Sequence, residues 1–354
     1  MRYFLELCLK SVQAAIVNIE AEIIVIDNNS EDDSCAMVKS VFPEVKLIEN
    51  KENFGFSKGN NIGVAEAKGE YLCILNPDTV VAEDTFTKLL TFSNGKDNIG
   101  AVGCKLINGV GAFLPESKRN IPYVKAAFKK LLGNSSNYYA NHLSEQQTGE
   151  IDILVGAFMF LKKTVYDSVG GFDEDYFMYG EDIDLSYKIL KAGYKNHYFG
   201  DATVIHFKGE STMRDKQYAR RFYGAMQIFY KKHFKKHLIF DMLVWVGIRV
   251  VYLFRKVKRD ATTSVLQYAF ISNTINKKLE AILPKKVLRS DVVINFEPNT
   301  ELILDANFLS YKTIIEILKT NSSSKQWTYK ILPHDSNFIL GSDTTISRGE
   351  IIQF

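Results

Sequence analysis

The chain has 354 residues, of which 46% are apolar and 24% are charged, and its formal net charge is +3. These values predict a globular protein with a sizeable core, built as one large α/β domain with an appendage or as two domains. A net charge this small does not indicate a nucleic-acid partner. The cysteines Cys8, Cys35, Cys73 and Cys104 form no CxxC pair, which argues against a zinc site and indicates buried thiols in a reducing compartment.

The first 80 residues alternate between predicted helices and buried strands. Residues 1–12 carry apolar residues at helical spacing, so we expect an amphipathic helix there and no signal peptide. Apolar runs at 22–27, 45–49 and 71–75 predict strands, with helices at 34–41 and up to Ala67 between them. This order is typical of an open, mostly parallel sheet, which binds ligands at the carboxyl ends of its strands. Asp27 and Asp78 both follow such ends.

The middle of the chain continues the α/β pattern and contains one long irregular segment. We expect a helix at 82–90, strands at 99–106 and 151–161, a helix at 163–169 and a strand at 202–206 that ends in His206. Residues 109–147 show no regular pattern. A loop of this length in a compact domain is often a substrate lid.

An acidic and aromatic stretch, residues 170–185, precedes a predicted helix that ends near Gly193. Its acids Glu181, Asp182 and Asp184 fall at the helix N-terminus, where the helix dipole favours an ionised carboxylate. An ionised carboxylate suits a general base. The alternative is ordinary acidic capping of a surface helix.

The last third of the chain divides into two predicted parts. Residues 219–284 are basic, aromatic and helical, and the apolar run 238–254 is flanked by lysines and arginines. We expect a helix lying in the membrane interface, with a buried packing helix as the alternative. Residues 285–354 predict a small α/β extension, with strands at 291–296, 302–304 and 327–332 and a helix at 310–318.

Together these motifs resemble the family 2 inverting glycosyltransferases, a GT-A fold, and most closely their bacterial rhamnosyltransferase-like branch. The resemblance covers roughly residues 1 to 230 in the family order. It rests on residues 25–32, 53–56, 60–63, 75–79, 155–157, 169–174, 180–185 and 206.

The resemblance implies a nucleoside diphosphate sugar as donor and a divalent metal, Mg²⁺ or Mn²⁺. Asp27 would accept a hydrogen bond from the base, and Asn29, Ser30 and Asn61 would line the nucleoside and diphosphate. Asp78 would be the main metal ligand, since Asn76 stands where the family motif has its first acid. His206 would be a second ligand or a diphosphate contact, and the alternative for it is a structural role.

The same resemblance makes Asp182 the catalytic base, with Glu181 as a supporting residue. Asp182 would take the proton of an acceptor hydroxyl as that oxygen displaces the diphosphate with inversion. No nucleophilic side chain is then needed, and the sequence shows no Ser-His-Asp or Cys-His pattern.

The chain departs from the family at its start. The family normally begins with a strand and a polar turn that form one wall of the nucleotide site, whereas this sequence starts at the helix that would follow them. If that strand is missing, we expect weaker donor binding and impaired folding.

We therefore expect a glycosyltransferase domain at 1–218, the basic helical segment at 219–284 and the extension at 285–354. The predicted function is sugar transfer to a glycan or lipid-linked acceptor in cell-surface polysaccharide synthesis, in the cytoplasm at the inner face of the membrane. One alternative is a catalytically impaired nucleotide-binding protein. Another is a metal-dependent nucleotidyltransferase, which should show a basic triphosphate-binding loop that this sequence lacks.

Overall fold

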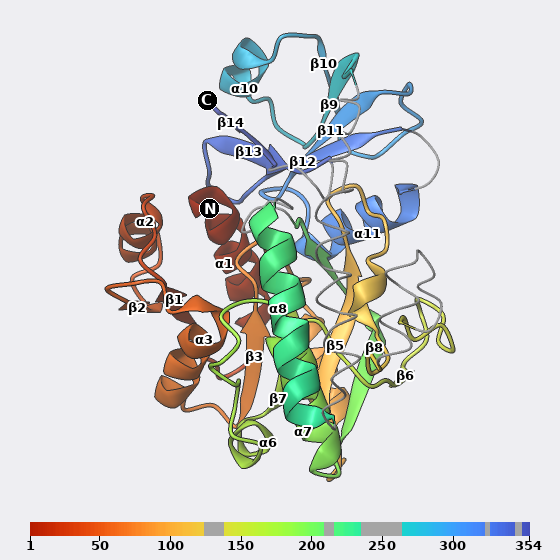
Figure 1. Cartoon of the computed structure of the whole chain (residues 1–354). Helices are drawn as coiled ribbons and strands as arrows, with labels where there is room; N and C mark the ends of the chain where they lie inside the picture. The colour runs from red at the N-terminus through yellow and green to blue at the C-terminus, as the bar shows by residue number, and fades with distance from the viewer. Residues whose placement is uncertain (124–137, 209–215, 235–263, 323–325, 344–348) are drawn as a thin grey trace.

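The computed structural model describes residues 1–123, 138–208, 216–234, 264–322, 326–343 and 349–354. Its strands form a six-stranded sheet and a two-stranded sheet in the N-terminal part, and a second six-stranded sheet in the C-terminal part. In Figure 1 the C-terminal sheet lies above the other two, and helix α8 (Lys216–His233) lies in front of the large N-terminal sheet.

The large N-terminal sheet has the strand order β3-β7-β5-β8-β4, and β6 pairs with β8. Its strands are β3 (Tyr71–Leu75), β4 (Thr79–Val80), β5 (Ile99–Ile107), β6 (Gly149–Glu150), β7 (Phe158–Lys162) and β8 (Lys195–His206). β5 and β8 run parallel, and β7, β4 and β6 are antiparallel to their partners. All of β5 is buried, which explains why its sequence does not alternate between polar and apolar residues. The predicted open α/β architecture is confirmed, but the prediction of a mostly parallel sheet is wrong for this sheet: among its described strands β5 and β8 are the one parallel pair.

Helices flank these strands where the apolar spacing predicted them. They are α1 (Arg2–Ile16), α2 (Ser34–Val41), α3 (Gly55–Glu66), α4 (Thr85–Ser93), α6 (Lys163–Ser168) and α7 (Glu181–Lys191). The start of α3 is tied to the acidic stretch, because Phe56 N–H donates to the Phe177 carbonyl at 2.8 Å. Gly55 has a φ of +79°, and a Cβ atom there would lie 2.3 Å from the same carbonyl oxygen. Only glycine allows this close approach.

The first two strands form a sheet of their own. β1 (Ile24–Asp27) and β2 (Lys46–Glu49) pair in parallel, and Leu5, Val38 and Phe42 of the adjoining helices pack in one apolar cluster beside them. Among the described residues, β1 has no strand on its other edge, and β3 has one unpaired edge as well. The predicted β-α-β-α-β run is therefore split between two sheets. The split lies beside the strand ending in Asp27, where the family resemblance places a further strand.

The C-terminal sheet has the order β10-β9-β11-β12-β13-β14. Its elements are β9 (Gln267–Ile271), α10 (Lys277–Ile282), β10 (Val287–Ser290), β11 (Thr300–Asp305), α11 (Tyr311–Asn321), β12 (Thr328–Leu332), β13 (Phe338–Gly341) and β14 (Glu350–Gln353). β9 and α10 precede residue 285, so this sheet begins within the segment that the sequence assigned to the helical region. The predicted strand at 291–296 is wrong. Ser290 Oγ instead bonds to the backbone of Val292, a local turn that competes with strand pairing.

The C-terminal sheet and the N-terminal part share one apolar core. Phe4 and Leu7 of α1 and Phe207 after β8 belong to the same buried cluster as residues of α11 and the C-terminal strands. A polar contact adds to it: the Glu83 carboxylate accepts hydrogen bonds from the backbone N–H groups of Tyr311 and its neighbour, at 2.6 and 2.9 Å. An acid at a helix N-terminus is a favourable cap.

This shared core makes a stability prediction. Phe4 is 1% exposed and its ring packs edge-on against Phe207, with centroids 5.1 Å apart. Phe4→Ala should lower the free energy of unfolding by about 3–5 kcal/mol, the usual cost of removing a buried phenylalanine. Urea unfolding measures this. Phe308→Ala, at a position that is 36% exposed, is the control and should cost about 1 kcal/mol or less. Equal losses in the two variants would contradict the shared core.

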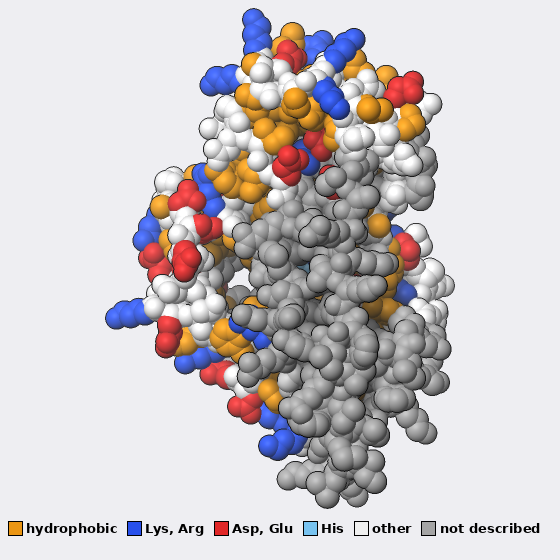
Figure 2. Space-filling model, turned by 45° about the horizontal axis from the view of Figure 1, so that its top comes forward, with side chains coloured by type: hydrophobic (Ala, Val, Ile, Leu, Met, Phe, Trp, Pro, Cys, Tyr) orange, Lys and Arg blue, Asp and Glu red, His pale blue; other side chains and the backbone are white. Residues whose placement is uncertain are grey.

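The basic apolar segment predicted at the membrane interface falls largely outside the described residues, because 235–263 are not described. No helix in the described part of the chain is both long and apolar enough to cross a membrane. Figure 2 shows acidic and basic side chains mixed over the described surface of one face, as the small net charge predicts.

Candidate functional site

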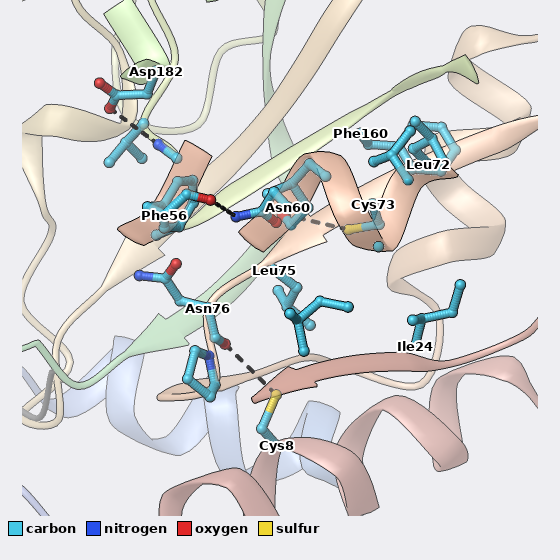
Figure 3. A pocket seen from close by; sticks show the side chains of 18 of the residues that line it. Cys8, Ile24, Phe56, Asn60, Leu72, Cys73, Leu75, Asn76, Phe160 and Asp182 are labelled. Atoms are coloured by element: carbon cyan, nitrogen blue, oxygen red, sulfur yellow. Dashed lines mark hydrogen bonds between the residues drawn. The ribbon is translucent and has the colours of Figure 1, made fainter. Parts of the chain in front are cut away.

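A cleft of about 970 Å³ runs between the two N-terminal sheets and reaches the start of α7. Apolar side chains of α1, β1 and β3, such as Leu9, Ile24 and Leu72, line one end of it. The other end is polar and includes Asp78 and Asp182. Figure 3 looks into this cleft, with Asp182 and Ile24 on opposite sides of the view. The polar end is the candidate active site.

Asp182 lies in the first turn of α7, as the sequence predicted. The helix begins after Gly180, which has a φ of +81°. The Asp182 side chain is nearly buried, and its Oδ2 atom accepts hydrogen bonds from the Gly156 N–H at 3.1 Å and from Arg119 Nη2 at 2.6 Å. Its Oδ1 atom accepts from the Ile183 N–H at 2.8 Å. These donors hold an ionised carboxylate at the cleft wall.

Glu181 lines the cleft beside Asp182 but differs from it in its contacts. It is 7% exposed, and its Oε2 atom has no hydrogen-bond partner among the described residues. Burial and then the neighbouring Asp182 carboxylate raise the pKa of Glu181 to about 8. The raised pKa favours the protonated form of Glu181, which can donate a hydrogen bond.

Asp184, the third acid of the motif, takes part in the contact between α7 and α8. It is fully buried, and its Oδ1 atom lies 2.6 Å from His233 Nε2 of α8 and 3.3 Å from the Tyr176 hydroxyl. Lys188 on the same helix lies 3.5 Å from its other oxygen. These contacts join α8 to α7, so Asp184 has a structural role.

Asp78 and His206 are brought together by strand pairing. β4 and β8 pair antiparallel with Thr79 opposite His206, although the two are distant in sequence. His206 Nε2 lies 3.4 Å from Asp78 Oδ1 and 3.4 Å from Asn76 Nδ2. Asp78 is 1% exposed, and neither of its carboxylate oxygens has a hydrogen-bond partner among the described residues.

This pair fits a divalent cation. A buried carboxylate without donors is costly unless a cation compensates its charge. The Asp78 oxygens and the imidazole are suitable ligand atoms for Mn²⁺ or Mg²⁺, although two protein ligands leave most of the coordination shell to substrate and water. No group of three or more His, Cys, Asp or Glu side chains in the described part of the chain could hold a metal by itself.

The residues predicted for the nucleoside do not line the cleft. Asp27, at the end of β1, accepts a hydrogen bond from the Ser30 N–H at 3.0 Å. Asn29 has a φ of 62°, and both it and Ser30 are exposed. The cleft is lined here by Asn28 and not by these three residues.

Asn61 is engaged in a structural network. Its Nδ2 atom donates to the Phe172 carbonyl at 2.9 Å and to Glu174 at 3.0 Å. Its Oδ1 atom accepts from the Tyr166 hydroxyl and from the Phe172 N–H. The structure therefore collects Asp182, Glu181, Asp78 and His206 on one cleft, and leaves Asp27, Asn29, Ser30 and Asn61 off its walls.

Among the charged cleft residues that sequence reasoning missed are Glu116, Arg119 and Lys208, which have contacts to or near the predicted site residues. Glu116 and Lys208 form an ion pair near His206, and this pairing, against the effect of burial, lowers the pKa of Glu116. Glu116 and Arg119 come from the segment 115–121, which the sequence assigned to an irregular loop. A run of polar residues before Pro122 offered no periodic signal that would have singled them out.

Comparisons with known proteins bear on the identity of the site. Residues 3–170 match the family model "Glycosyl transferase family 2". The N-acetylglucosaminyl-diphospho-decaprenol L-rhamnosyltransferase of Mycobacterium tuberculosis is 26% identical over 210 residues, which are 54% of this chain and 68% of that protein. Rhamnosyltransferase WbbL of Escherichia coli is 27% identical over 161 residues, 44% of this chain and 61% of that protein.

Among solved structures, the mannosyltransferase PcManGT from Pyrobaculum calidifontis, in complex with GDP-Man and Mn2+, has a TM-score of 0.47 at 17% identity. The match covers 72% of this chain and 67% of that one. The family match includes the segments that carry Asp27 and Asp78, and it ends where the acidic stretch begins. The resemblance predicted from these motifs is confirmed for residues 3–170, which match the glycosyl transferase family 2 model over just under half of the chain.

Proposed function

We propose that this glycosyltransferase moves a sugar from a nucleoside diphosphate donor to an acceptor hydroxyl with inversion at the anomeric carbon. The observation that carries the proposal is the shared cleft: the Asp182 carboxylate and the Asp78–His206 pair line the same space. One group can accept a proton, and the other can bind a cation beside a diphosphate. A single-displacement transfer can use both.

In this reaction Asp182 accepts the proton of the acceptor hydroxyl. The acceptor oxygen forms a bond to the anomeric carbon while the bond from that carbon to the diphosphate oxygen breaks. The bonding electrons leave with the diphosphate. Because a single displacement from the opposite face produces the product, stereochemistry inverts and no covalent enzyme intermediate forms.

Asp78 and His206 would hold the divalent cation, whose chemistry is to offset the negative charge that grows on the leaving diphosphate. Lys208 follows His206 closely in the sequence, and it lines the cleft. It is ion-paired with Glu116. An ammonium at this position suits a phosphate oxygen.

The nucleoside is assigned to the end of β1. Asp27 stays our proposal for the base contact, and Asn29 and Ser30 for the nearby donor contacts. Asn28 is a further candidate, because it lines the cleft and its Nδ2 atom bonds to the Gly55 carbonyl at 2.9 Å. The contacts of Asn61 favour a structural role for that side chain.

The acceptor is proposed as a glycan or lipid-linked sugar of cell-surface polysaccharide synthesis, with the enzyme at the inner membrane face. The support is the M. tuberculosis relative, whose name includes an N-acetylglucosaminyl-diphospho-decaprenol group. Residues 219–284 are the candidate membrane contact. The alternative of a catalytically impaired protein receives no support from the comparisons.

Incubation with Mn²⁺ and a panel of UDP-, dTDP- and GDP-sugars, with a crude lipid acceptor, tests the function. We expect one donor to raise the melting temperature and to release its nucleotide only when acceptor is present. If no nucleotide stabilises the protein, the donor site is wrong. Stabilisation without turnover on any acceptor would contradict the proposed transfer.

A further inference from the structure

Arg119 contacts the candidate base directly. Its Nη2 atom donates to Asp182 Oδ2 at 2.6 Å and also to the Leu154 carbonyl. The guanidinium is 8% exposed. The backbone of Arg119 pairs with Ile153 in both directions, each hydrogen bond being 3.0 Å long, so the position of the side chain is set by a buried strand-like bridge.

The contact leaves the two oxygens of Asp182 unequal. Oδ2 accepts from two donors, Arg119 and the Gly156 N–H, whereas Oδ1 accepts from the Ile183 N–H. A carboxylate oxygen has two lone-pair directions. Oδ1 therefore keeps one lone-pair direction free to accept a hydrogen bond from the acceptor hydroxyl, whereas both directions of Oδ2 are occupied.

The contact also distinguishes Asp182 from Glu181. The free-energy cost of one negative charge on two adjacent buried carboxylates is lower than that of two, because like charges repel. Arg119 forms an ion pair with Asp182, whereas Glu181 has a buried oxygen with no donor. Burial would lower the pKa of Arg119, but the nearby Asp182 outweighs burial and raises it, so the guanidinium stays charged.

Other ionisable groups surround the Glu181–Asp182 pair, but none of the following takes the place of Arg119 beside Asp182. They are Asp184 on α7, with its partners Tyr176, Lys188 and His233, then Tyr138 beside the guanidinium, and Glu116, Lys208 and His206 further along the cleft. Lys188 and His233 compensate Asp184, and Lys208 compensates Glu116. Of the cations in the described part of the chain, Arg119 is the one in an ion pair with Asp182.

We propose that Arg119 is a positioning residue that keeps the negative charge of the Glu181–Asp182 pair on Asp182 and leaves Oδ1 free for the acceptor hydroxyl. The proposal rests on the function proposed above, because it assumes that Asp182 is the base. It assigns the proton of the pair to Glu181, which can then donate a hydrogen bond to a substrate oxygen.

The test compares pH profiles of kcat for the full chain and its Arg119→Met, Arg119→Gln and Arg119→Lys variants. Without the cation, protonation of Asp182 becomes easier, so the acid limb should move to higher pH by about 1–2 units. At pH values below both acid limbs, kcat of the variants should be about 10–100-fold lower than that of the wild type, and it should recover as the pH rises. The donor KM should stay within about twofold, since Arg119 touches no proposed donor residue.

Arg119→Lys keeps the charge and should keep the wild-type acid limb. Its kcat should be lower at every pH, because one ammonium does not reproduce the planar fork that reaches Asp182 and Leu154 together. Arg289→Met is the control, since it removes an exposed arginine of β10 in the C-terminal sheet, away from the residues that line the cleft. Its profile should match the wild type. A loss in Arg119→Met that is equal at all pH values, with an unmoved acid limb, would overturn the proposal.

A second measurement separates this proposal from the function itself. The carboxyl carbons of Asp182 and Glu181 can be followed by ¹³C NMR, with the signals assigned from Asp182→Asn and Glu181→Gln. In the wild type the proton of the pair should reside on Glu181, and Arg119→Gln should move part of it to Asp182. If the wild type transfers no sugar but the proton moves in the variant, the function fails and the role of Arg119 stands. If the proton is distributed in the same way in both proteins, the role of Arg119 is wrong.

Discussion

Asp182→Asn is expected to lower kcat by about 10²–10⁴-fold, the usual contribution of a positioned general base. The asparagine side chain has nearly the same shape, but its amide oxygen is too weak a base to take the acceptor proton. Donor binding should change little, because Asp182 lies at the start of α7 and the proposed diphosphate site is at Asp78 and His206. Initial rates at saturating donor and acceptor, together with a nucleotide thermal shift, measure the two effects separately.

Asp175→Asn is the matched control for this variant. Asp175 belongs to the same acidic stretch but is exposed and pairs with Lys232 at 2.5 Å. It should keep wild-type activity. If Asp182→Asn retains more than about a tenth of the wild-type kcat, Asp182 is not the base. Glu181 would then be the next candidate, and its raised pKa would predict a rate that rises up to about pH 8.

The sequence was informative where local chemistry decides structure. The acidic run before an apolar helix predicted α7 and placed Glu181 and Asp182 in its first turn, as the structure has them. Asp78 and His206 each followed a predicted strand. Their contact depends on the pairing of β4 with β8, and this register is a long-range property that the family resemblance supplied and periodicity did not.

The residues that sequence reasoning missed depend on tertiary contacts. Arg119 is nearly buried only because residues 115–121 fold against Ile153 and the start of α7. In the sequence it is one arginine in an irregular, polar loop, and such residues are usually solvated. Asn61 shows the opposite case. The family resemblance placed it at the nucleoside and diphosphate, whereas in the structure its amide bonds to residues of the segment 166–174.

Local sequence patterns also could not predict that β1 and β2 form a sheet separate from the large one. An apolar strand such as Ile24–Asp27 has the same sequence signature whether one or both of its edges are paired. The cleft runs between these two sheets, and the predicted nucleoside residues do not line it.

Asp78→Asn is expected to have opposite effects on the free protein and on its nucleotide complex. In the free protein the Asp78 carboxylate is buried without hydrogen-bond donors, and His206 lies 3.4 Å away. Replacing the charge by a neutral amide should raise the free energy of unfolding by about 1–3 kcal/mol, the cost of an unsatisfied buried polar group. Urea unfolding without metal measures this gain.

With Mn²⁺ present, the same variant should lose the metal-dependent part of nucleotide binding. The loss should be at least the roughly 10–100-fold that removal of even an outer-shell partner of a metal site costs. Nucleotide titrations with Mn²⁺ and with EDTA separate this part from the rest, because only the Mn²⁺ titration should differ between variant and wild type. Asp201→Asn, an exposed acid on the same strand as His206, is the control and should change neither titration.

An Asp78→Asn variant that keeps the difference between the Mn²⁺ and EDTA titrations would rule out Asp78 as the metal ligand. A variant that is less stable without metal would show that the buried carboxylate has a structural partner and is not held for a cation.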